Sequence, residues 1–429
     1  MQRISGWGLY PRSHTHLTPW HSERWQGSGI PRGLGRSYGD ASFRSGEYTW
    51  HLLPYNRVLS WDAEQGILTA EAGLSLYEVI HKVLPQGWFP YVVPGTQFVT
   101  LGGAFASNIH GKNHHVQGSF ADHVQWIELR LPSGELKRVS PQEDLFWATA
   151  GGMGLTGIIE RLQLRLARVP TSYILNQVVR APDIEAIVRI LTEQEMHYPF
   201  AVAWIDHHHP KNRGIIHLGR FAEHKELPLS LQKQPFRPRP KGFLRIPFLL
   251  PFAAFNKYTT AWISLYYWMQ HKEGNHLVPY NTYFFPLDGV DKWNRLWGHQ
   301  GFVQFQFIVP QAEDFLSLWA RLRHAPARSF LTVLKRLGPQ KGPLAFSGPG
   351  WTLAIDLPAT AAIRSFLSLL IDKVLERNGR IYLTKDSLLT PEQAQASYPE
   401  WKNFLNLKAQ IDPQEKLRSD LSQRIGLTR

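Results

Sequence analysis

Three glycine-rich stretches in the first 160 residues have the residue types that can hold a dinucleotide. They are PRGLGRSYGD at 31–40, PGTQFVTLGGAFASNIHGKNHH at 94–115 and AGGMGLTGII at 150–159. Glycine tolerates positive φ and lets backbone amides approach a ligand closely, so successive glycine turns can cradle a pyrophosphate. On glycine content alone, the same stretches also fit tight turns between strands, and both interpretations stay open at this point.

Two familiar nucleotide-binding motifs do not match. Gly33, Gly35 and Gly39 lack the G-x-G-x-x-G spacing, and no acidic residue follows about 20 positions on to bind a ribose hydroxyl. The chain also lacks the G-x-x-x-x-G-K-[ST] sequence of a P-loop. A Rossmann-type NAD site and a P-loop are therefore disfavoured.

Two histidine groups could suggest metal binding, and neither pattern supports it. His110 and His114 have i, i+4 spacing, but Gly111 and the loop context argue against a helix there, and no H-E-x-x-H motif is present. The triple 207–209 precedes Pro210 and reads as an exposed turn. We predict no metal site.

The elements that position these stretches change character near residue 165. Residues 50–83 predict two strands joined by a turn at 62–66 and then a helix with apolar spacing of three and four. A strand pair follows at 123–140 with a turn at 132–134, and 154–169 alternates like a long strand. By contrast, residues 11–30 show no helical period, so the N-terminal unit is expected to be abbreviated.

After Pro170 the pattern favours strands that are each followed by a helix. Residues 182–198 resemble an amphipathic helix, and the strands expected at 303–310 and 351–358 precede helical stretches at 312–325 and 360–379. Strand followed by helix around one sheet indicates an α+β substrate domain.

Composition limits the classes of protein and partner. A length of 429 residues favours two domains, and the absence of Cys excludes disulfides, thiolate-bound zinc, iron–sulfur clusters, a Cys nucleophile and a Cys-linked flavin. The net charge of +13 suits an anionic partner, but no nucleic-acid-binding motif accompanies it, so we expect no nucleic acid partner. The first 20 residues contain no apolar signal region, which favours a cytoplasmic chain.

The apolar, aromatic segment at 243–269 is interrupted too often for a membrane-spanning helix of about 20 apolar residues. The interruptions are Arg245, Pro247, Pro251 and the pair Asn256 and Lys257. The segment either makes peripheral contact with a membrane, or caps an apolar substrate, or forms an aromatic part of the core. The sequence leaves these alternatives open.

The glycine motifs resemble those of vanillyl-alcohol-oxidase-like, PCMH-type FAD proteins. RGLGRSYGD, then PGT with LGGAFASNIHGKNHH, then LFWATAGGMGLTGII occur there in the same order and at similar separations. HGKNHH, together with GRIYLTKDS at 379–387, is similar specifically to the bacterial decaprenylphosphoryl-β-D-ribose oxidases. The resemblance covers nearly the whole chain.

This resemblance implies an α+β fold with a two-part PCMH-type FAD-binding domain, formed by residues 1–165 and 380–429, and an inserted α+β substrate (cap) domain at 166–379. It implies non-covalent FAD, because Tyr38 stands where several relatives attach the flavin through His. The residues that it assigns to FAD are Arg32, Gly33, Gly35, Arg36, Ser37, Tyr38, Gly39, Pro94, Gly95, Thr96, Thr100, Gly102, Gly103, Ser107, Asn108, Ile109, Gly111, Asn113, Gly152, Gly157, Ile158 and Tyr382.

The resemblance also assigns the chemistry. Lys385 would position or deprotonate the reacting hydroxyl, with His110 beside it and Tyr382 against the flavin, because a desolvated Lys can be tuned toward a neutral pKa. The substrate residues that it implies are Lys112, Tyr38, Gln304, Lys335, Thr352 and Ala354. The last two stand where the relatives usually carry Asn and Cys.

The implied function is FAD-dependent oxidation of a secondary hydroxyl on a sugar, namely the 2′-hydroxyl of a polyprenyl-phosphoryl pentose in bacterial cell-envelope biosynthesis. A separate NAD(P)H-dependent short-chain reductase would complete an epimerisation. The alternatives are a soluble aldonolactone or alditol oxidase of the same fold and a non-catalytic flavin-binding scaffold. The electron acceptor and the oligomeric state stay open.

Overall fold

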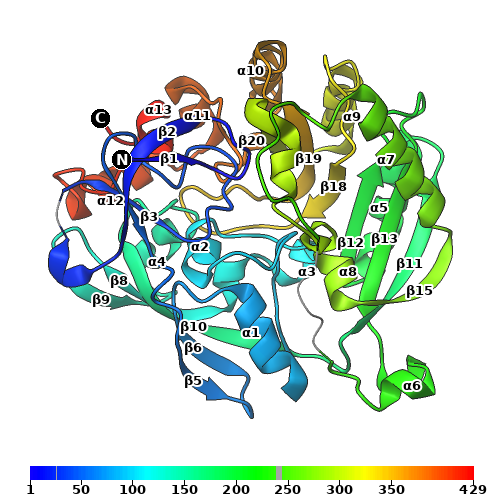
Figure 1. The fold of residues 1–429 in the computed structure, drawn as a ribbon, viewed down its shortest axis with the longest axis horizontal. Helices are drawn as coiled ribbons and strands as arrows, with labels where there is room; N and C mark the ends of the chain where they lie inside the picture. Colours follow the sequence, from blue (N-terminus) through cyan, green and yellow to red (C-terminus); the bar gives the residue numbers. More distant parts are fainter. Residues whose placement is uncertain (26, 238–243) are drawn as a thin grey trace.

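The computed structural model describes residues 1–25, 27–237 and 244–429, in which helices and strands are mixed around three larger sheets (Figure 1). We call them the N-terminal sheet, the hairpin sheet and the large sheet. A short parallel pair is formed by β14 (Leu244–Arg245) and β16 (Val290–Asp291).

The N-terminal sheet has the strand order β1-β2-β4-β3. Its strands are β1 (Gln2–Ser5), β2 (Arg12–Pro19), β3 (Gly29–Arg32) and β4 (Tyr48–His51). Strands β2 and β3 both run parallel to β4. In the described part of 11–30, the connection between β2 and β3 contains a 3-10 turn, Ser22–Arg24, and no α-helix, as the missing helical period predicted.

The hairpin sheet has the order β5-β6-β10-β8-β9, with β7 also paired to β10. Its strands are β5 (Val58–Asp62), β6 (Ile67–Glu71), β7 (Trp88–Pro90), β8 (Val124–Arg130), β9 (Leu136–Val139) and β10 (Ile158–Arg168). Both predicted turns, 62–66 and 132–134, are confirmed. The first is closed by Asp62 Oδ1, which accepts hydrogen bonds from the backbone N–H groups of Glu64 and Gln65.

Helices of the first half connect and cover the hairpin sheet. The predicted helix is α1 (Leu76–Val83), which starts with a capping box formed by Ser75 and Glu78 and buries an apolar face against the sheet. Three shorter helices follow: α2 (Leu101–Ala106), α3 (His114–Gln117) and α4 (Asp144–Thr149). Thr100 caps α2, because its side chain accepts a hydrogen bond from the Gly103 N–H.

The large sheet has the order β15-β11-β13-β12-β18-β19-β17-β20, and its pairings are antiparallel. Strands expected at 303–310 and 351–358 are confirmed. The strands are β11 (Tyr173–Ala181), β12 (Phe200–Ile205), β13 (Gly214–Phe221), β15 (Gly274–Pro279), β17 (Phe302–Val309), β18 (Thr332–Leu337), β19 (Gly350–Pro358) and β20 (Arg380–Ile381).

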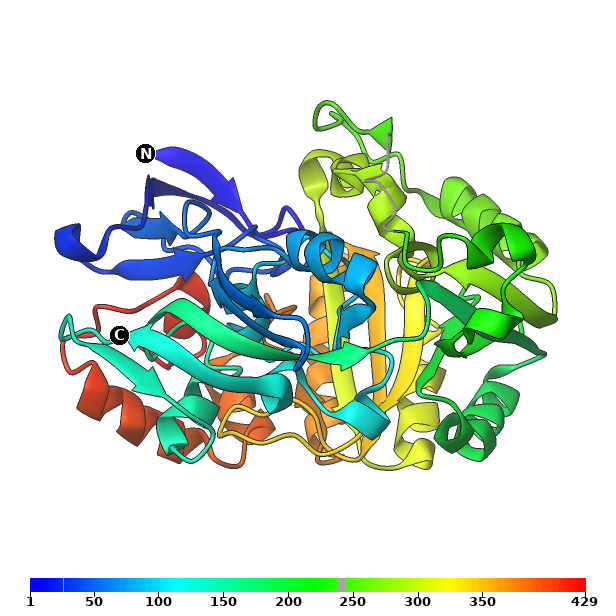
Figure 2. The ribbon, with the colours of Figure 1, turned by 90° about the horizontal axis from the view of Figure 1, so that it is seen from below.

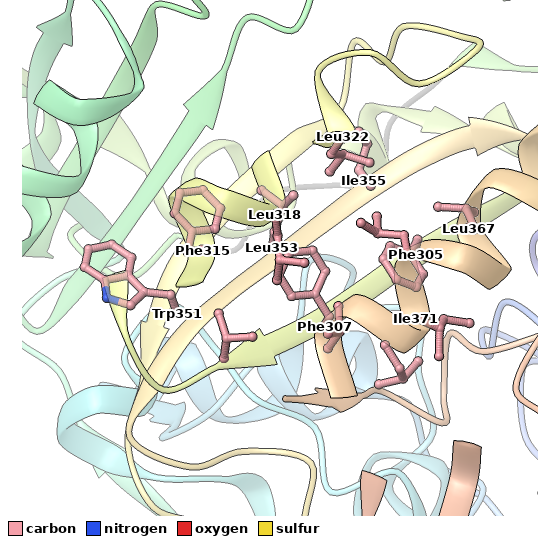
Figure 3. Packing of buried hydrophobic residues seen from close by; sticks show 14 of the residues in the cluster. Phe305, Phe307, Phe315, Leu318, Leu322, Trp351, Leu353, Ile355, Leu367 and Ile371 are labelled. Atoms are coloured by element: carbon pink, nitrogen blue, oxygen red, sulfur yellow. The ribbon is translucent and has the colours of Figure 1, made fainter. Parts of the chain in front are cut away.

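One face of the large sheet packs against the three predicted helices, α5 (Ile184–Gln194), α9 (Ala312–Leu322) and α10 (Ala361–Leu375). Alternate residues of β17 and β19 point into this core, as the period of two in a strand requires. Figure 3 shows them packed together with side chains of α9 and α10: Phe305, Phe307, Trp351, Leu353, Ile355, Phe315, Leu318, Leu322, Leu367 and Ile371.

On the opposite face of this sheet lies α7 (Lys257–Gln270), whose Tyr267 and Trp268 pack against Val178, Trp204 and Ile215. The remaining helices of this region are α6 (Leu229–Gln232) and α8 (Tyr280–Phe284). In the described residues, no helix has the length and apolar character that a membrane span needs.

The C-terminal segment returns to the N-terminal sheet. It contains α11 (Pro391–Ser397), α12 (Trp401–Ile411) and α13 (Asp420–Arg424), and the two chain ends lie on the same side of the molecule (Figure 1). Arg424 bridges the two regions, with its Nη2 atom 2.8 Å from Asp40 Oδ1 and 2.9 Å from Asp386 Oδ2. Gly29 also forms a parallel bridge with Leu417.

Two expectations from the sequence need correction. His207 was expected in an exposed turn, but it is buried, with its ring 5.4 Å from that of Trp319 and its Nδ1 accepting a hydrogen bond from the Ser329 N–H. The segment 243–269, of which residue 243 lies outside the described residues, is only partly an aromatic part of the core: Phe255, Tyr267 and Trp268 pack against buried residues, whereas Phe248, Phe252 and several aromatic residues of α7 are exposed.

Candidate functional site

A cavity of about 870 Å³ lies between the glycine turns and the face of the large sheet that α5, α9 and α10 leave uncovered. Figure 2 shows these two parts of the chain side by side, with the N-terminal half in blue to teal and the large sheet in green to orange. The structure brings to this one cavity the following predicted residues: Arg32, Gly33, Gly35, Arg36, Ser37, Tyr38, Pro94, Gly95, Thr96, Thr100, Gly102, Gly103, Ser107, Ile109, His110, Gly111, Lys112, Gly157, Gln304, Lys335, Ala354, Tyr382 and Lys385.

One side of the cavity, which we call the turn wall, consists of its lining residues from 31–38 and 93–112. Here the backbone is shaped by close packing. A Cβ on Gly33 would lie 2.1 Å from Thr100 Oγ1, so only glycine fits beside the residue that caps α2. At Gly95, by contrast, an added Cβ would meet no atom within 4 Å. The protein's own packing does not require glycine at 95, whereas close approach of a ligand would.

The turn wall is also suited to an anion. In the described residues, no carbonyl accepts a hydrogen bond from the backbone N–H groups of Gly35, Arg36 or Ser37. The Arg36 guanidinium lies 3.8 Å from the centre of the Trp7 ring, and that of Arg32 donates to Ser5 O at 2.9 Å. Burial lowers the pKa of Arg32 to about 10, so it stays charged at neutral pH. Free amides and fixed guanidinium groups together fit a pyrophosphate.

The opposite side, the sheet wall, consists of Gln304, Val333, Lys335, Ala354 and the turn after β20 that carries Tyr382 and Lys385. Because side chains alternate along a strand, Gln304 and Ala354 point to the cavity while their neighbours in β17 and β19 enter the helix-covered core. Which way Gln304 faces was open from the sequence, and the structure places it in the cavity wall.

Lys385 lies in a polar cluster on the sheet wall. Its Nζ is 5.6 Å from the centre of the Tyr38 ring. The Gln304 amide donates to Asp356 Oδ1 at 2.5 Å. Burial lowers the pKa of Lys385, the Lys335 ammonium lowers it further, and Asp356 opposes both. Burial likewise raises the pKa of Asp356. These shifts make an uncharged amine accessible near neutral pH.

His110 and Tyr382 form a second group beside this cluster. Their ring centres are 5.1 Å apart, and the Tyr382 hydroxyl donates to Ser107 O at 2.8 Å, which joins the turn after β20 to the turn wall. His110 Nε2 lies 3.0 Å from Gln306 Nε2, and no described residue bonds its buried Nδ1. Burial, with the neighbouring Lys335, holds the pKa of His110 well below its ordinary value. His110 is therefore neutral, and its buried Nδ1 has no hydrogen-bond partner among the described residues.

Two further lysines face the same cavity. Lys112 donates to Tyr283 O, and its Nζ lies 4.1 Å from the centre of the Tyr283 ring. Burial lowers the pKa of Lys112 to about 7, with a contribution from Lys335, and burial lowers the pKa of Lys335 to about 8. Three lysines that share one cavity repel one another, and an anionic ligand would relieve that repulsion.

Three of the glycine-motif residues predicted to bind FAD lie outside the cavity wall. A Cβ on Gly39 would lie 1.9 Å from Asp386 O, and one on Gly152 would lie 2.2 Å from Ala148 O, so these glycines serve chain packing. Asn108 has φ of 37° and accepts a hydrogen bond from the Ala121 N–H at 3.1 Å. Its short polar side chain stabilises the local turn.

Asn113, Ile158 and Thr352 are also absent from the cavity lining. Asn113 donates to Tyr91 O at 2.8 Å, and Ile158 is buried at the start of β10 in the hairpin-sheet core. Thr352 points the same way as Ala354, but it is fully buried and donates to Phe307 O at 2.8 Å. Its role is to hold the strands beneath the cavity, so direct substrate contact through Thr352 is not supported.

Sequence reasoning missed Asp356, Gln306 and a group under α7. Asp356 is two positions after Ala354 and therefore on the same face of β19, a signal that the alternation contained. Under α7, Asn176 Nδ2 lies 3.1 Å from His217 Nδ1, and His217 Nε2 lies 3.1 Å from the Tyr267 hydroxyl. These residues come from strands and a helix far apart in sequence, and no local pattern links them.

Comparisons with known proteins find one matching family and several relatives. The family described as FAD binding domain matches residues 26–140. Decaprenylphosphoryl-β-D-ribose oxidase of Mycolicibacterium smegmatis is 36% identical over 409 residues, covering 93% of this chain and 89% of that protein. An uncharacterized protein of Streptomyces coelicolor is 32% identical over 82% of this chain and its own full length. L-gulonolactone oxidase of Scyliorhinus torazame is 24% identical over 89% of this chain and 86% of that protein.

Proposed function

The chain belongs to the family of FAD-dependent oxidases that includes decaprenylphosphoryl-β-D-ribose oxidase, and we propose that it oxidises a secondary hydroxyl on a polyprenyl-phosphoryl pentose. One observation carries the proposal: a single cavity has a glycine turn wall suited to a pyrophosphate and is lined by three lysines, Lys112 on the turn wall and Lys335 and Lys385 on the sheet wall. A phosphorylated sugar would supply an anionic partner for these three buried lysines.

The proposal includes the domain arrangement and the way FAD is held. Residues 1–165 and 380–429 form the FAD-binding unit around a cap at 166–379; the Arg424 contacts with Asp40 and Asp386 support this division. FAD is non-covalent, since Tyr38 offers no imidazole for attachment. The turn-wall residues, Gly95 among them, would bind the pyrophosphate, and Tyr382 would contact the flavin.

When bound, FAD would accept the hydride of the carbinol C–H bond, that is, its hydrogen together with two electrons. This chain's residues orient the sugar and manage the hydroxyl proton. Lys385, with its lowered pKa, is the acceptor of that proton, and it is held by the turn after β20, in which its backbone N–H donates to Tyr382 O at 2.9 Å. Gln304 holds the Asp356 carboxylate by a hydrogen bond, and Lys335 binds phosphate or sugar oxygens.

The partners follow from the same chemistry. Oxidation at the 2′ position creates a ketone, and a separate NAD(P)H-dependent short-chain reductase would reduce it from the other face to complete an epimerisation. We place the protein in the cytoplasm, in peripheral contact with the inner membrane through 243–269, because its substrate carries a polyprenyl chain.

Anaerobic flavin bleaching tests the cofactor, the activity and the substrate class together. The FAD-loaded protein should lose its visible flavin absorbance with a polyprenyl-phosphoryl pentose and keep it with free pentoses or alditols. Bleaching by free polyols, and not by the lipid-linked sugar, would instead support the aldonolactone or alditol oxidase alternative, which the gulonolactone oxidase relative favours. A flavin that no sugar reduces would leave only a binding scaffold.

A further inference from the structure

Helix α7 carries apolar side chains on its outer face as well as on the face that packs against the large sheet. The residues that it buries are Thr260 and Ser264, and its cavity-lining side chains include Tyr267 and Gln270. Its exposed face carries Tyr258, Trp262, Leu265, Tyr266 and Met269. A surface helix normally turns polar side chains to the solvent, so the apolar outer face of α7 indicates a face that something else covers.

The exposed apolar face continues into the preceding segment. Leu244, Phe248 and Phe252 are exposed there, and Phe252 keeps 71% of its surface accessible. Together with the five exposed residues of α7 they form a patch that we call the aromatic face. Trp262, which is 65% exposed, stacks on Tyr266 with ring centres 5.5 Å apart. Exposed Trp and Tyr side chains are the residues enriched where proteins meet the headgroup layer of a bilayer.

Charge around the aromatic face selects its partner. Residues 244–272 contain Arg245, Lys257 and Lys272 and no Asp or Glu. Arg245 contacts Asp291 at 3.5 Å but keeps 65% of its side chain exposed, and Lys257 and Lys272 are exposed. Two copies of a chain with net charge +13 repel each other, whereas an anionic surface attracts these cations.

We propose that the aromatic face is a docking surface for an anionic lipid bilayer, on which α7 lies parallel to the membrane plane. The helix has 14 residues, or about 21 Å, enough to lie in the headgroup layer and too short to cross the hydrocarbon core. Its opposite side lines the cavity, so a helix about 10 Å thick separates the bilayer from the cavity.

This arrangement gives the substrate a route, and that part rests on the proposed function. A polyprenyl-phosphoryl sugar can keep its chain in the bilayer beside α7 while its charged head enters the cavity toward Lys112 and Lys335. Docking would therefore raise activity toward a substrate presented in vesicles without changing activity toward a short-chain, water-soluble analogue of it.

Vesicle co-sedimentation of the FAD-loaded full chain tests the docking surface without any substrate. The protein should bind vesicles of phosphatidylglycerol and phosphatidylcholine, bind vesicles of phosphatidylcholine alone more weakly, and dissociate as salt is raised. The double variant Trp262→Glu/Met269→Glu should bind at least tenfold more weakly. Leu369→Glu is the matched control, because Leu369 is 70% exposed on α10, outside the aromatic face.

Three results would overturn the proposal: no binding of the unaltered protein to anionic vesicles, equal loss in the Leu369→Glu control, or a dimer in sedimentation that the double variant abolishes. The last would assign the aromatic face to a second copy. Flavin content and thermal stability of each variant show that it is folded. Vesicle binding that persists while free polyols alone bleach the flavin would refute the substrate assignment and leave the docking surface standing.

Discussion

The two walls of the cavity are built from different groups: one mainly from backbone and the other from side chains. The turn wall presents backbone, and its shape depends on the absence of side chains, as at Gly33 beside Thr100. The sheet wall presents side chains whose direction is set by strand alternation, as at Gln304 and Ala354. If the turn wall holds the cofactor and the sheet wall acts on the substrate, changes in one wall should leave the function of the other intact.

The largest expected effect is on the sheet wall. Lys385→Ala should slow anaerobic flavin bleaching by roughly 10²–10⁴-fold, the usual range for loss of a positioned base, while FAD stays bound. Lys402→Ala, which removes an exposed lysine of α12, is the control and should bleach at the normal rate. Retention of FAD is measured by flavin absorbance after gel filtration. Unchanged bleaching in Lys385→Ala would remove this lysine from the reaction.

The matching change on the turn wall is Gly95→Val. A side chain at 95 meets no protein atom within 4 Å of its Cβ, so the thermal stability of the FAD-free protein should stay the same. FAD should bind at least roughly tenfold more weakly, because the new side chain occupies space that the ligand needs. Titration of FAD into the apoprotein measures this. Gly348→Val, at another open position, is the control; equal loss of affinity in both variants would break the distinction between the walls.

Two charged residues near Lys385, Asp356 and Lys335, should shift the pH profile of kcat/KM in opposite directions when they are replaced. Asp356 raises the pKa of Lys385 and Lys335 lowers it, so Asp356→Asn should shift the acidic limb of kcat/KM to lower pH by roughly one unit. Lys335→Met should shift it to higher pH, since the amine then holds its proton more tightly. The pH profiles of both variants decide this. Shifts in the same direction would mean that the limb reports a group other than Lys385.

The two walls also differ in how well the sequence predicts them. The turns, the hairpin strands and the helices at α1, α5, α9 and α10 follow from local spacing, because each pattern concerns neighbours in the chain. Backbone motifs predicted most of the turn wall for the same reason. The motif nevertheless included Gly39 and Gly152, whose glycines are required by packing against Asp386 O and Ala148 O, and a sequence does not show what a missing Cβ would have met.

The sheet wall was harder to predict, because it joins residues from distant strands. Asp356 and Gln306 were missed although each lies two positions from a residue that was predicted. The exposure of Trp262 and Phe252 was also open, since an aromatic run fits a core as well as a surface. These outcomes depend on which face of an element meets another element, and that is settled by tertiary packing rather than by local pattern.

The smallest expected effect separates two residues of one strand. Ala354 and Thr352 point to the same side of β19, but only Ala354 lines the cavity. Ala354→Cys should therefore change KM for the sugar by less than about tenfold with kcat nearly constant, because one added atom alters packing against substrate more than chemistry. Thr352→Asn should leave KM unchanged and lower the unfolding free energy by about 1–3 kcal/mol, since the buried Thr352 hydroxyl bonds both Phe307 O and Gln306. Steady-state kinetics and denaturant unfolding of the two variants separate these effects. A change of KM in Thr352→Asn without a loss of stability would show that Thr352 affects substrate binding although it does not line the cavity.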